Sequence, residues 1–122
     1  MSQSCTINQP RYDDYRKSVD FIKRYICPGG CLPSHNVISG ARPRRSDMQI
    51  IDLRHIALDY ARALQHWHDA FMAEIDAVKA LGFDEKFIRM WRFYLSYCEG
   101  GFRERIIGTY QITMAKPCYR PT

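Results

Sequence analysis

Apolar residues recur every three or four positions along most of the chain, which is the spacing of an amphipathic helix. The first such stretch predicts a helix over residues 12–27, and a Pro-Gly-Gly turn at residues 28–30 ends it. Ser34 is then placed to cap a short helix, while the basic segment 40–47 is expected to form a turn or loop. The pattern therefore predicts a largely helical first third of the chain.

The middle of the chain predicts two longer amphipathic helices. The first keeps one apolar face from Tyr60 to Val78 and ends at Gly82, where a C-cap glycine belongs. Asp84 is the expected N-cap of the second helix, which the glycines at 100–101 should loosen or end. These helices are expected to make up most of the regular structure.

A period of two marks the candidate strands. Residues 108–117, GTYQITMAKP, alternate cleanly and predict a strand with one well-buried face. MQIIDL, residues 48–53, suits a buried strand, and SCTI, residues 4–7, resembles the end of a strand that has been cut short. Two complete strands are too few for an independent sheet, so we expect an incomplete part of an α/β sheet protein.

Composition and charge narrow the class of protein only slightly. The 122 residues are 46% hydrophobic and 25% charged, which are globular values. The net charge of +5 is spread along the chain, which favours a generic basic surface. A nucleic-acid binder ranks last, because no helix-turn-helix or basic aromatic stripe is present. The chain shows neither a signal peptide nor an apolar run of about 20 residues, so we expect a cytoplasmic protein.

The cysteine and histidine spacings predict neither a disulfide framework nor a metal site. The five cysteines are an odd number without paired spacing. Cys27 and Cys31 offer at most half of a zinc site, and no second pair completes it. His66 and His68 are two positions apart on a predicted helix and should therefore point to different faces.

Three separate stretches, in order and in roughly the right spacing, resemble the C-terminal part of the cyclopropane-fatty-acyl-phospholipid synthase family, with its related mycolic acid methyltransferases. They are DFIKRYICPGGCLPS at 20–34, DLRHIALDYARALQHW at 52–67 and FIRMWRFYLSYCEGGFRERIIGTYQITMAKP at 87–117. The resemblance runs from about Cys5 to Pro117, and three motifs in register make it far more specific than any one alone.

The resemblance implies the C-terminal part of a class I, Rossmann-like methyltransferase fold, a mostly parallel seven-stranded sheet whose last strand is antiparallel. On this interpretation residues 5–7 end the fifth strand, residues 48–53 form the sixth and residues 108–115 the seventh. Residues 1–122 would then be the C-terminal part of one methyltransferase domain, with 118–122 as a tail.

The resemblance also implies an activity. Family enzymes use S-adenosylmethionine to add a methylene or methyl group to the cis double bond of phospholipid acyl chains, with bicarbonate as the general base. The family pattern Tyr-x-x-x-Leu-x-x-Trp falls on Tyr60–Trp67, so Tyr60 takes the role of the bicarbonate-holding tyrosine. A phenol O–H can donate to an anion. Gln3 stands near the position of a family His or Gln beside the same anion.

The family's Gly-rich loop, which cradles the cofactor, has no counterpart here: no G-x-G-x-x-G pattern occurs. We therefore expect the cofactor-binding half to be absent and the chain alone to bind no S-adenosylmethionine. It is expected to be a truncated fragment or to need a complementary N-terminal polypeptide. The alternative is a non-catalytic helical piece that pairs with a complete enzyme. The expected partners are phospholipid acyl chains at the inner membrane face, and no nucleic acid.

Three assignments stay open on sequence alone. His55 precedes Tyr60 by five residues, and its spacing does not decide whether it is near a site. The basic residues within 42–45 either contact acidic headgroups or form a solvated loop. A set of aromatic residues at helical spacing either forms a core or lines an acyl-chain tunnel: Trp67, Phe71, Trp91, Phe93, Tyr94 and Tyr97.

Overall fold

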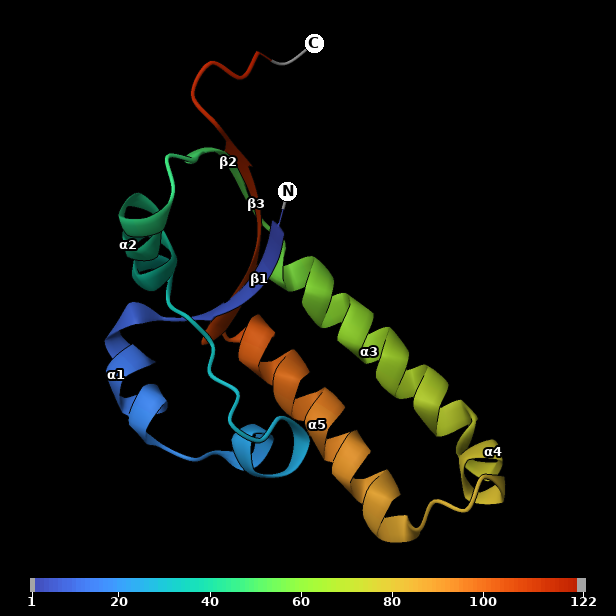
Figure 1. Cartoon of the computed structure of the whole chain (residues 1–122). Coiled ribbons are helices and arrows are strands. Elements are labelled where there is room, and N and C mark those ends of the chain that lie inside the picture. Colours follow the sequence, from blue (N-terminus) through green and yellow to red (C-terminus); the bar gives the residue numbers. More distant parts are fainter. Residues whose placement is uncertain (1, 121–122) are drawn as a thin grey trace. The chain divides into compact units, whose positions relative to one another are not determined.

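The computed structural model describes the backbone of residues 2–120 and the side chains of residues 5–8, 10–40 and 46–120. The chain forms two compact units. The sheet unit comprises Met1–Ile56 and Ile106–Thr122, and the helical unit comprises Ala57–Arg105. Figure 1 shows the elements of both units in chain order.

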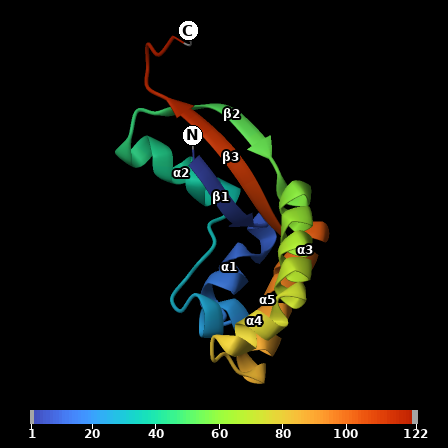
Figure 2. The ribbon, with the colours of Figure 1, turned by 90° about the vertical axis from the view of Figure 1, so that its right-hand side faces the viewer.

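The sheet unit is built on three strands: β1 (Ser2–Ile7), β2 (Gln49–His55) and β3 (Ile107–Ala115). Their order is β1-β3-β2, and β3 pairs antiparallel with both neighbours. Figure 2 shows β3 between the other two strands. The predicted antiparallel last strand is therefore confirmed. The sequence predicted two complete strands, and the structure has a further one, because the N-terminal stretch forms a six-residue strand.

β3 is more buried than the sequence predicted, because it is the central strand of the sheet. Thr109 and Ile112 are both buried although they lie on opposite faces of the strand, so β3 is covered on both sides. The sequence predicted one buried face only. The prediction of a buried strand at residues 48–53 is wrong, because β2 is an edge strand and Ile51 and Leu53 are exposed.

The single helix predicted over residues 12–27 is also wrong. The structure has α1 (Gln9–Lys17) followed by a short π-helical stretch, η1 (Ile22–Ile26). The Lys23 ammonium donates to the carbonyl oxygens of Tyr15 and Ser18 and lies 3.8 Å from the centroid of the Tyr15 ring. The break between the two helices is stabilised because this lysine satisfies carbonyl groups at the end of α1.

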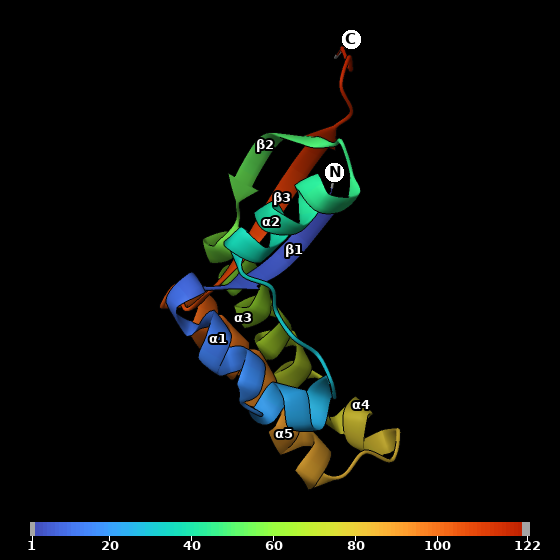
Figure 3. The same cartoon turned by 60° about the vertical axis from the view of Figure 1, so that its left-hand side comes forward.

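The predicted helix after Ser34 is confirmed, and it is longer than expected. Ser34 is buried, and its hydroxyl accepts a hydrogen bond from the Val37 backbone N–H at 3.2 Å. The helix, α2 (His35–Arg45), lies over one face of the sheet (Figure 3). The loop predicted from residue 40 is helical as far as Arg45, because alanine and arginine are good helix formers.

The helical unit is an antiparallel hairpin of α3 (Ala57–Ala73) and α5 (Glu85–Arg103), with the short α4 (Ile75–Ala80) between them (Figure 1). Gly82 has a φ of +92°, which confirms a C-cap glycine there, but it follows α4. The single helix predicted from Tyr60 to Val78 is wrong, because the structure divides it at Glu74 into α3 and α4. α5 passes through the glycines at 100–101, so the predicted end there is wrong. The two long helices bury one apolar stripe each: Ala57, Ala61 and Leu64 on α3, and Ile88, Leu95, Cys98 and Phe102 on α5.

An exposed ion pair closes the turn between α4 and α5. The Lys79 ammonium donates to the Glu85 carboxylate at 2.7 Å. The hydrogen bond and the attraction of opposite charges lower the pKa of Glu85 and raise the pKa of Lys79. The pair therefore favours the charged form of both groups.

The N-cap of α5 gives a first testable prediction. The Asp84 carboxylate accepts a hydrogen bond from the Phe87 backbone N–H at 2.8 Å. Asp84→Ala should lower the free energy of unfolding by about 1 kcal/mol, because this N–H then lacks its cap. Urea denaturation followed by circular dichroism measures the loss. Asp84→Asn is the matched control and should keep most of the stability; equal stability of Asp84→Ala and the parent would contradict the prediction.

Candidate functional site

Polar side chains from all three strands lie at one end of the sheet, where β1 and β2 finish and β3 begins. β1 and β2 run parallel to each other, so their carboxyl ends lie at the same end of the sheet. Gly108 starts the returning strand there. A Cβ on Gly108 would lie 3.3 Å from Thr6 Oγ1, 3.3 Å from His55 Nε2 and 3.2 Å from the Tyr110 ring. Glycine thus allows these three side chains to converge.

Two histidines flank Tyr110 at this end of the sheet. The ring centroids of His55 and Tyr110 are 4.8 Å apart, and those of His35 and Tyr110 are 5.8 Å apart. The structure therefore places His55 at this end of the sheet, which its spacing in the sequence did not decide. The sequence missed Tyr110, because its proximity to His55 depends on the register between β2 and β3, which the alternating pattern does not reveal. It missed His35, because the contact of His35 with Tyr110 depends on how α2 packs on the sheet.

Tyr60 lies in the first turn of α3, half-buried in an aromatic cluster. Its ring centroid is 5.0 Å from that of Phe102 and 5.9 Å from that of Trp67, which it meets edge-on. Leu64, the second specified residue of the Tyr-x-x-x-Leu-x-x-Trp pattern, is buried and lies between Tyr60 and Trp67 along the helix. The pattern is therefore one continuous stripe on α3, as the spacing of i, i+4 and i+7 requires.

Gln3, the second predicted site residue, lies in β1, where its backbone pairs with Gln111. Its side chain is outside the described residues. Tyr60 belongs to the helical unit and Gln3 to the sheet unit. The anion-binding roles assigned to both residues stay predictions.

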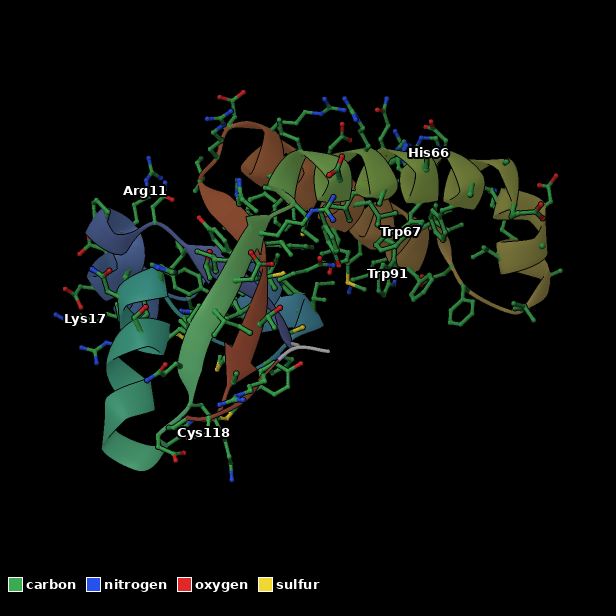
Figure 4. All side chains as sticks on the ribbon, turned by 90° about the horizontal axis from the view of Figure 1, so that it is seen from above. Arg11, Lys17, His66, Trp67, Trp91 and Cys118 are labelled. Carbon is green, nitrogen blue, oxygen red and sulfur yellow. The ribbon has the colours of Figure 1, made fainter. Side chains whose placement is uncertain are left out.

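The aromatic residues of the hairpin are only partly a core. Trp67, Phe93 and Tyr97 are half-exposed, so a pure core assignment is wrong for them. The indole N–H of Trp91 is buried and has no hydrogen-bond acceptor among the described residues. Figure 4 shows Trp67 and Trp91 on one side of the hairpin and His66 on the opposite side of α3 from Trp67.

A backbone hydrogen bond stabilises the turn between Cys27 and Cys31. The Gly30 N–H donates to the Cys27 carbonyl oxygen at 2.9 Å, and the thiols of Cys27 and Cys31 are exposed. Within residues 2–120, as far as their side chains are described, no group of three His, Cys, Asp or Glu residues is placed to hold a metal ion. No helix in that part of the chain is long and apolar enough to span a bilayer.

Comparison with solved structures defines the fold. The chain superposes on the mycolic acid cyclopropane synthase CmaA1, complexed with SAH and CTAB, with a TM-score of 0.79 and 23% identity, over 93% of this chain and 42% of that one. The cyclopropane synthase MmaA2 from Mycobacterium tuberculosis gives a TM-score of 0.80 and 22% identity over the same shares. The fold is part of a class I, Rossmann-like methyltransferase fold.

Sequence comparison gives the family. Residues 1–112 match the family described as mycolic acid cyclopropane synthetase, and the chain belongs to that family. It is 37% identical over 114 residues to the tuberculostearic acid methyltransferase of Mycobacterium tuberculosis, over 93% of this chain and 27% of that protein. It is 33% identical over 96 residues to the cyclopropane-fatty-acyl-phospholipid synthase of Escherichia coli K12, over 79% and 24%. The chain spans about a quarter of the length of these curated relatives.

Proposed function

We propose that the chain forms the C-terminal part of a methyltransferase that adds a methylene or methyl group from S-adenosylmethionine to the double bond of phospholipid acyl chains. The observation that carries the proposal is the family match over residues 1–112. The two curated relatives described above are named for fatty-acyl products, which supports an acyl substrate. The intact Tyr60–Trp67 stripe supports a working site.

Tyr60 is the residue that we assign to the chemistry. Its hydroxyl would donate a hydrogen bond to bicarbonate, the anion that takes up the proton lost from the acyl chain. The rings of Phe102 and Trp67 contact the phenol ring of Tyr60, which fits this role because these contacts fix where the hydroxyl lies. The Gln3 amide would be a second donor to the same anion.

The residues of this chain do not fit the cofactor by themselves. S-adenosylmethionine needs a Gly-rich loop between a strand and a helix, and the sequence has none. We propose that other residues, on the same protein or on a complementary N-terminal polypeptide, supply that half. Calorimetric titration of the chain alone with S-adenosylmethionine should show no binding; micromolar binding would contradict this division of the site.

A hybrid enzyme tests the activity. The matched 96-residue segment of the Escherichia coli synthase is exchanged for this chain and expressed in a strain without its own synthase. The proposal predicts phospholipid acyl chains that are one carbon heavier, detected by gas chromatography and mass spectrometry. The unaltered Escherichia coli enzyme is the positive control. A folded hybrid that leaves the acyl chains unchanged would contradict the proposal.

The alternative function is a non-catalytic piece that pairs with a complete enzyme. The half-exposed Trp67, Phe93 and Tyr97 favour it, because exposed aromatic side chains are common in interfaces. Under this alternative the hybrid is inactive, and the isolated chain forms a stable complex with a complete family enzyme in size-exclusion chromatography.

A further inference from the structure

Two features of the sequence have no role in the proposed chemistry. They are the basic residues within 42–45, whose side chains are outside the described residues, and the two cysteines on either side of the Pro-Gly-Gly turn, Cys27 and Cys31. Both thiols are exposed and free. Two exposed thiols that lie close together can be oxidised to a disulfide, so the geometry of the turn is what matters for this pair.

The turn reverses the chain between the two cysteines. The Gly30 N–H donates to the Cys27 carbonyl oxygen at 2.9 Å, and Gly29 has a φ of +76°. Proline in the second position and a glycine with positive φ in the third are the features of a type II β-turn, whose first and fourth Cα atoms lie less than about 7 Å apart. Cys31 is the residue directly after this turn. The chain therefore returns toward Cys27 at the position of the second thiol.

The side chain of Cys27 lies next to the returning segment. A Cβ added to Gly30 would be 3.3 Å from the Cys27 Cβ. The Cα of Cys31 follows the Cα of Gly30 at about 3.8 Å. A disulfide needs the two cysteine Cα atoms about 4.4–6.8 Å apart and the two Cβ atoms about 3.5–4.5 Å apart. Because glycine has the widest choice of φ and ψ, Gly30 lets Cys31 adjust to these distances.

Hydrogen bonds hold both ends of this segment. On one side, the Cys27 N–H donates to the Ile22 carbonyl oxygen at 2.8 Å. On the other side, the Leu32 N–H donates to the Tyr15 hydroxyl at 3.2 Å. Two groups joined by a short segment meet each other at an effective concentration of about millimolar. The second thiol is therefore available to react as soon as the first one has been oxidised.

We propose that Cys27 and Cys31 form a reversible disulfide across this turn, with a small disulfide such as glutathione disulfide as the oxidant. The thiolate of one cysteine attacks a sulfur of glutathione disulfide, which gives a mixed disulfide and releases one glutathione thiolate. The thiolate of the other cysteine attacks the cysteine sulfur of the mixed disulfide, so that the bond between Cys27 and Cys31 forms and the second glutathione leaves. Two electrons pass from the pair to the oxidant, and the two protons lost by the cysteines go to the two glutathione thiolates.

The bridge is expected under oxidising conditions only. Thiols of a cytoplasmic protein stay reduced, and an exposed disulfide is more easily reduced than a buried structural one. When it forms, the bridge adds a covalent link between the end of η1 and the segment that leads into α2. Reduction removes this link again.

Mass spectrometry and thiol labelling of the purified full chain test the bridge. After incubation with glutathione disulfide the chain should be lighter by two hydrogen atoms, and peptide mapping should find Cys27 joined to Cys31. Alkylation of these two thiols by iodoacetamide should fall about ten-fold and should recover after treatment with dithiothreitol. Unchanged thiols, glutathione adducts without a bridge, or a bridge from either cysteine to the exposed Cys118 would overturn the proposal.

Matched variants test the role of the partner thiol and of the turn. Cys31→Ser leaves Cys27 without its partner and should accumulate a glutathione adduct on Cys27, whereas Cys118→Ser is the control and should form the bridge as the wild type does. Gly29→Ala places a side chain at a φ of +76° and should lower the bridged fraction several-fold in the folded chain. In urea, where the turn is lost, this variant should match the wild type. Circular dichroism confirms that each variant is folded, and an equal bridged fraction of folded Gly29→Ala and wild type would show that the turn does not bring the thiols together.

Discussion

Tyr60→Phe should lower the rate of methyl transfer by about 10²–10³-fold in the hybrid enzyme, the loss typical of removing one donor to an anion in an active site. The substitution removes the hydroxyl and keeps the ring. Because the ring makes the contacts with Phe102 and Trp67, the aromatic cluster and the stability of the helical unit should be preserved. The measurement is the initial rate of one-carbon addition to phospholipid acyl chains, with the melting temperature recorded in parallel.

Tyr119→Phe is the matched control for this prediction. Tyr119 is an exposed tyrosine of the sheet unit, near the C-terminal end of the described residues, whereas Tyr60 belongs to the helical unit. Its variant should retain the parent rate. A Tyr60→Phe enzyme that also keeps the parent rate would remove the bicarbonate-holding role from Tyr60.

Phe102→Ala should cause the largest loss of stability in the helical unit. Phe102 is only 3% exposed, and its ring lies against Tyr60. Truncating a buried phenylalanine typically lowers the free energy of unfolding by about 3–5 kcal/mol, because the transfer energy is lost and a cavity remains. Activity should fall with it, since Tyr60 loses the ring that holds it in place. Urea denaturation followed by circular dichroism measures the change.

Phe93→Ala provides the comparison on the same helix. Phe93 is 51% exposed, so the same substitution should cost about 1 kcal/mol or less. If the two variants unfold at the same urea concentration, the packing assigned to α3 and α5 is wrong.

The sequence predicted the helix ends well, because local backbone chemistry determines them. Ser34, Gly82 and Asp84 were expected at helix ends, and all three lie there. Each of these signals acts within four residues, so no tertiary information is needed. The alternation of apolar and polar residues that predicted a strand at residues 108–115 is likewise a local signal.

Features that depend on distant contacts were missed. The break in the first helix is stabilised by Lys23, which reaches back to carbonyl groups of Tyr15 and Ser18. α5 continues through two glycines because Cys98 and Phe102 on either side of them are buried, which outweighs a cost of about 1 kcal/mol per glycine. The exposure of β2 follows from its edge position, which only the strand order reveals.

The sequence also predicted only part of the candidate site. The motif identified Tyr60, and its aromatic contacts agree with helical spacing. The contact between Tyr60 and Phe102 was not predictable, because the two residues come from different helices and meet only in the hairpin. The contact between His55 and Tyr110 likewise depends on strand register.

The most direct measurement is transfer of a labelled methyl carbon by the purified hybrid enzyme. The enzyme is supplied with S-adenosylmethionine labelled in its methyl group and with phospholipid vesicles that carry unsaturated acyl chains. If this chain supplies a working part of the catalytic site, label enters the acyl chains, and Tyr60→Phe nearly abolishes it. A hybrid that is folded and binds S-adenosylmethionine, yet leaves the acyl chains unlabelled, would contradict that function.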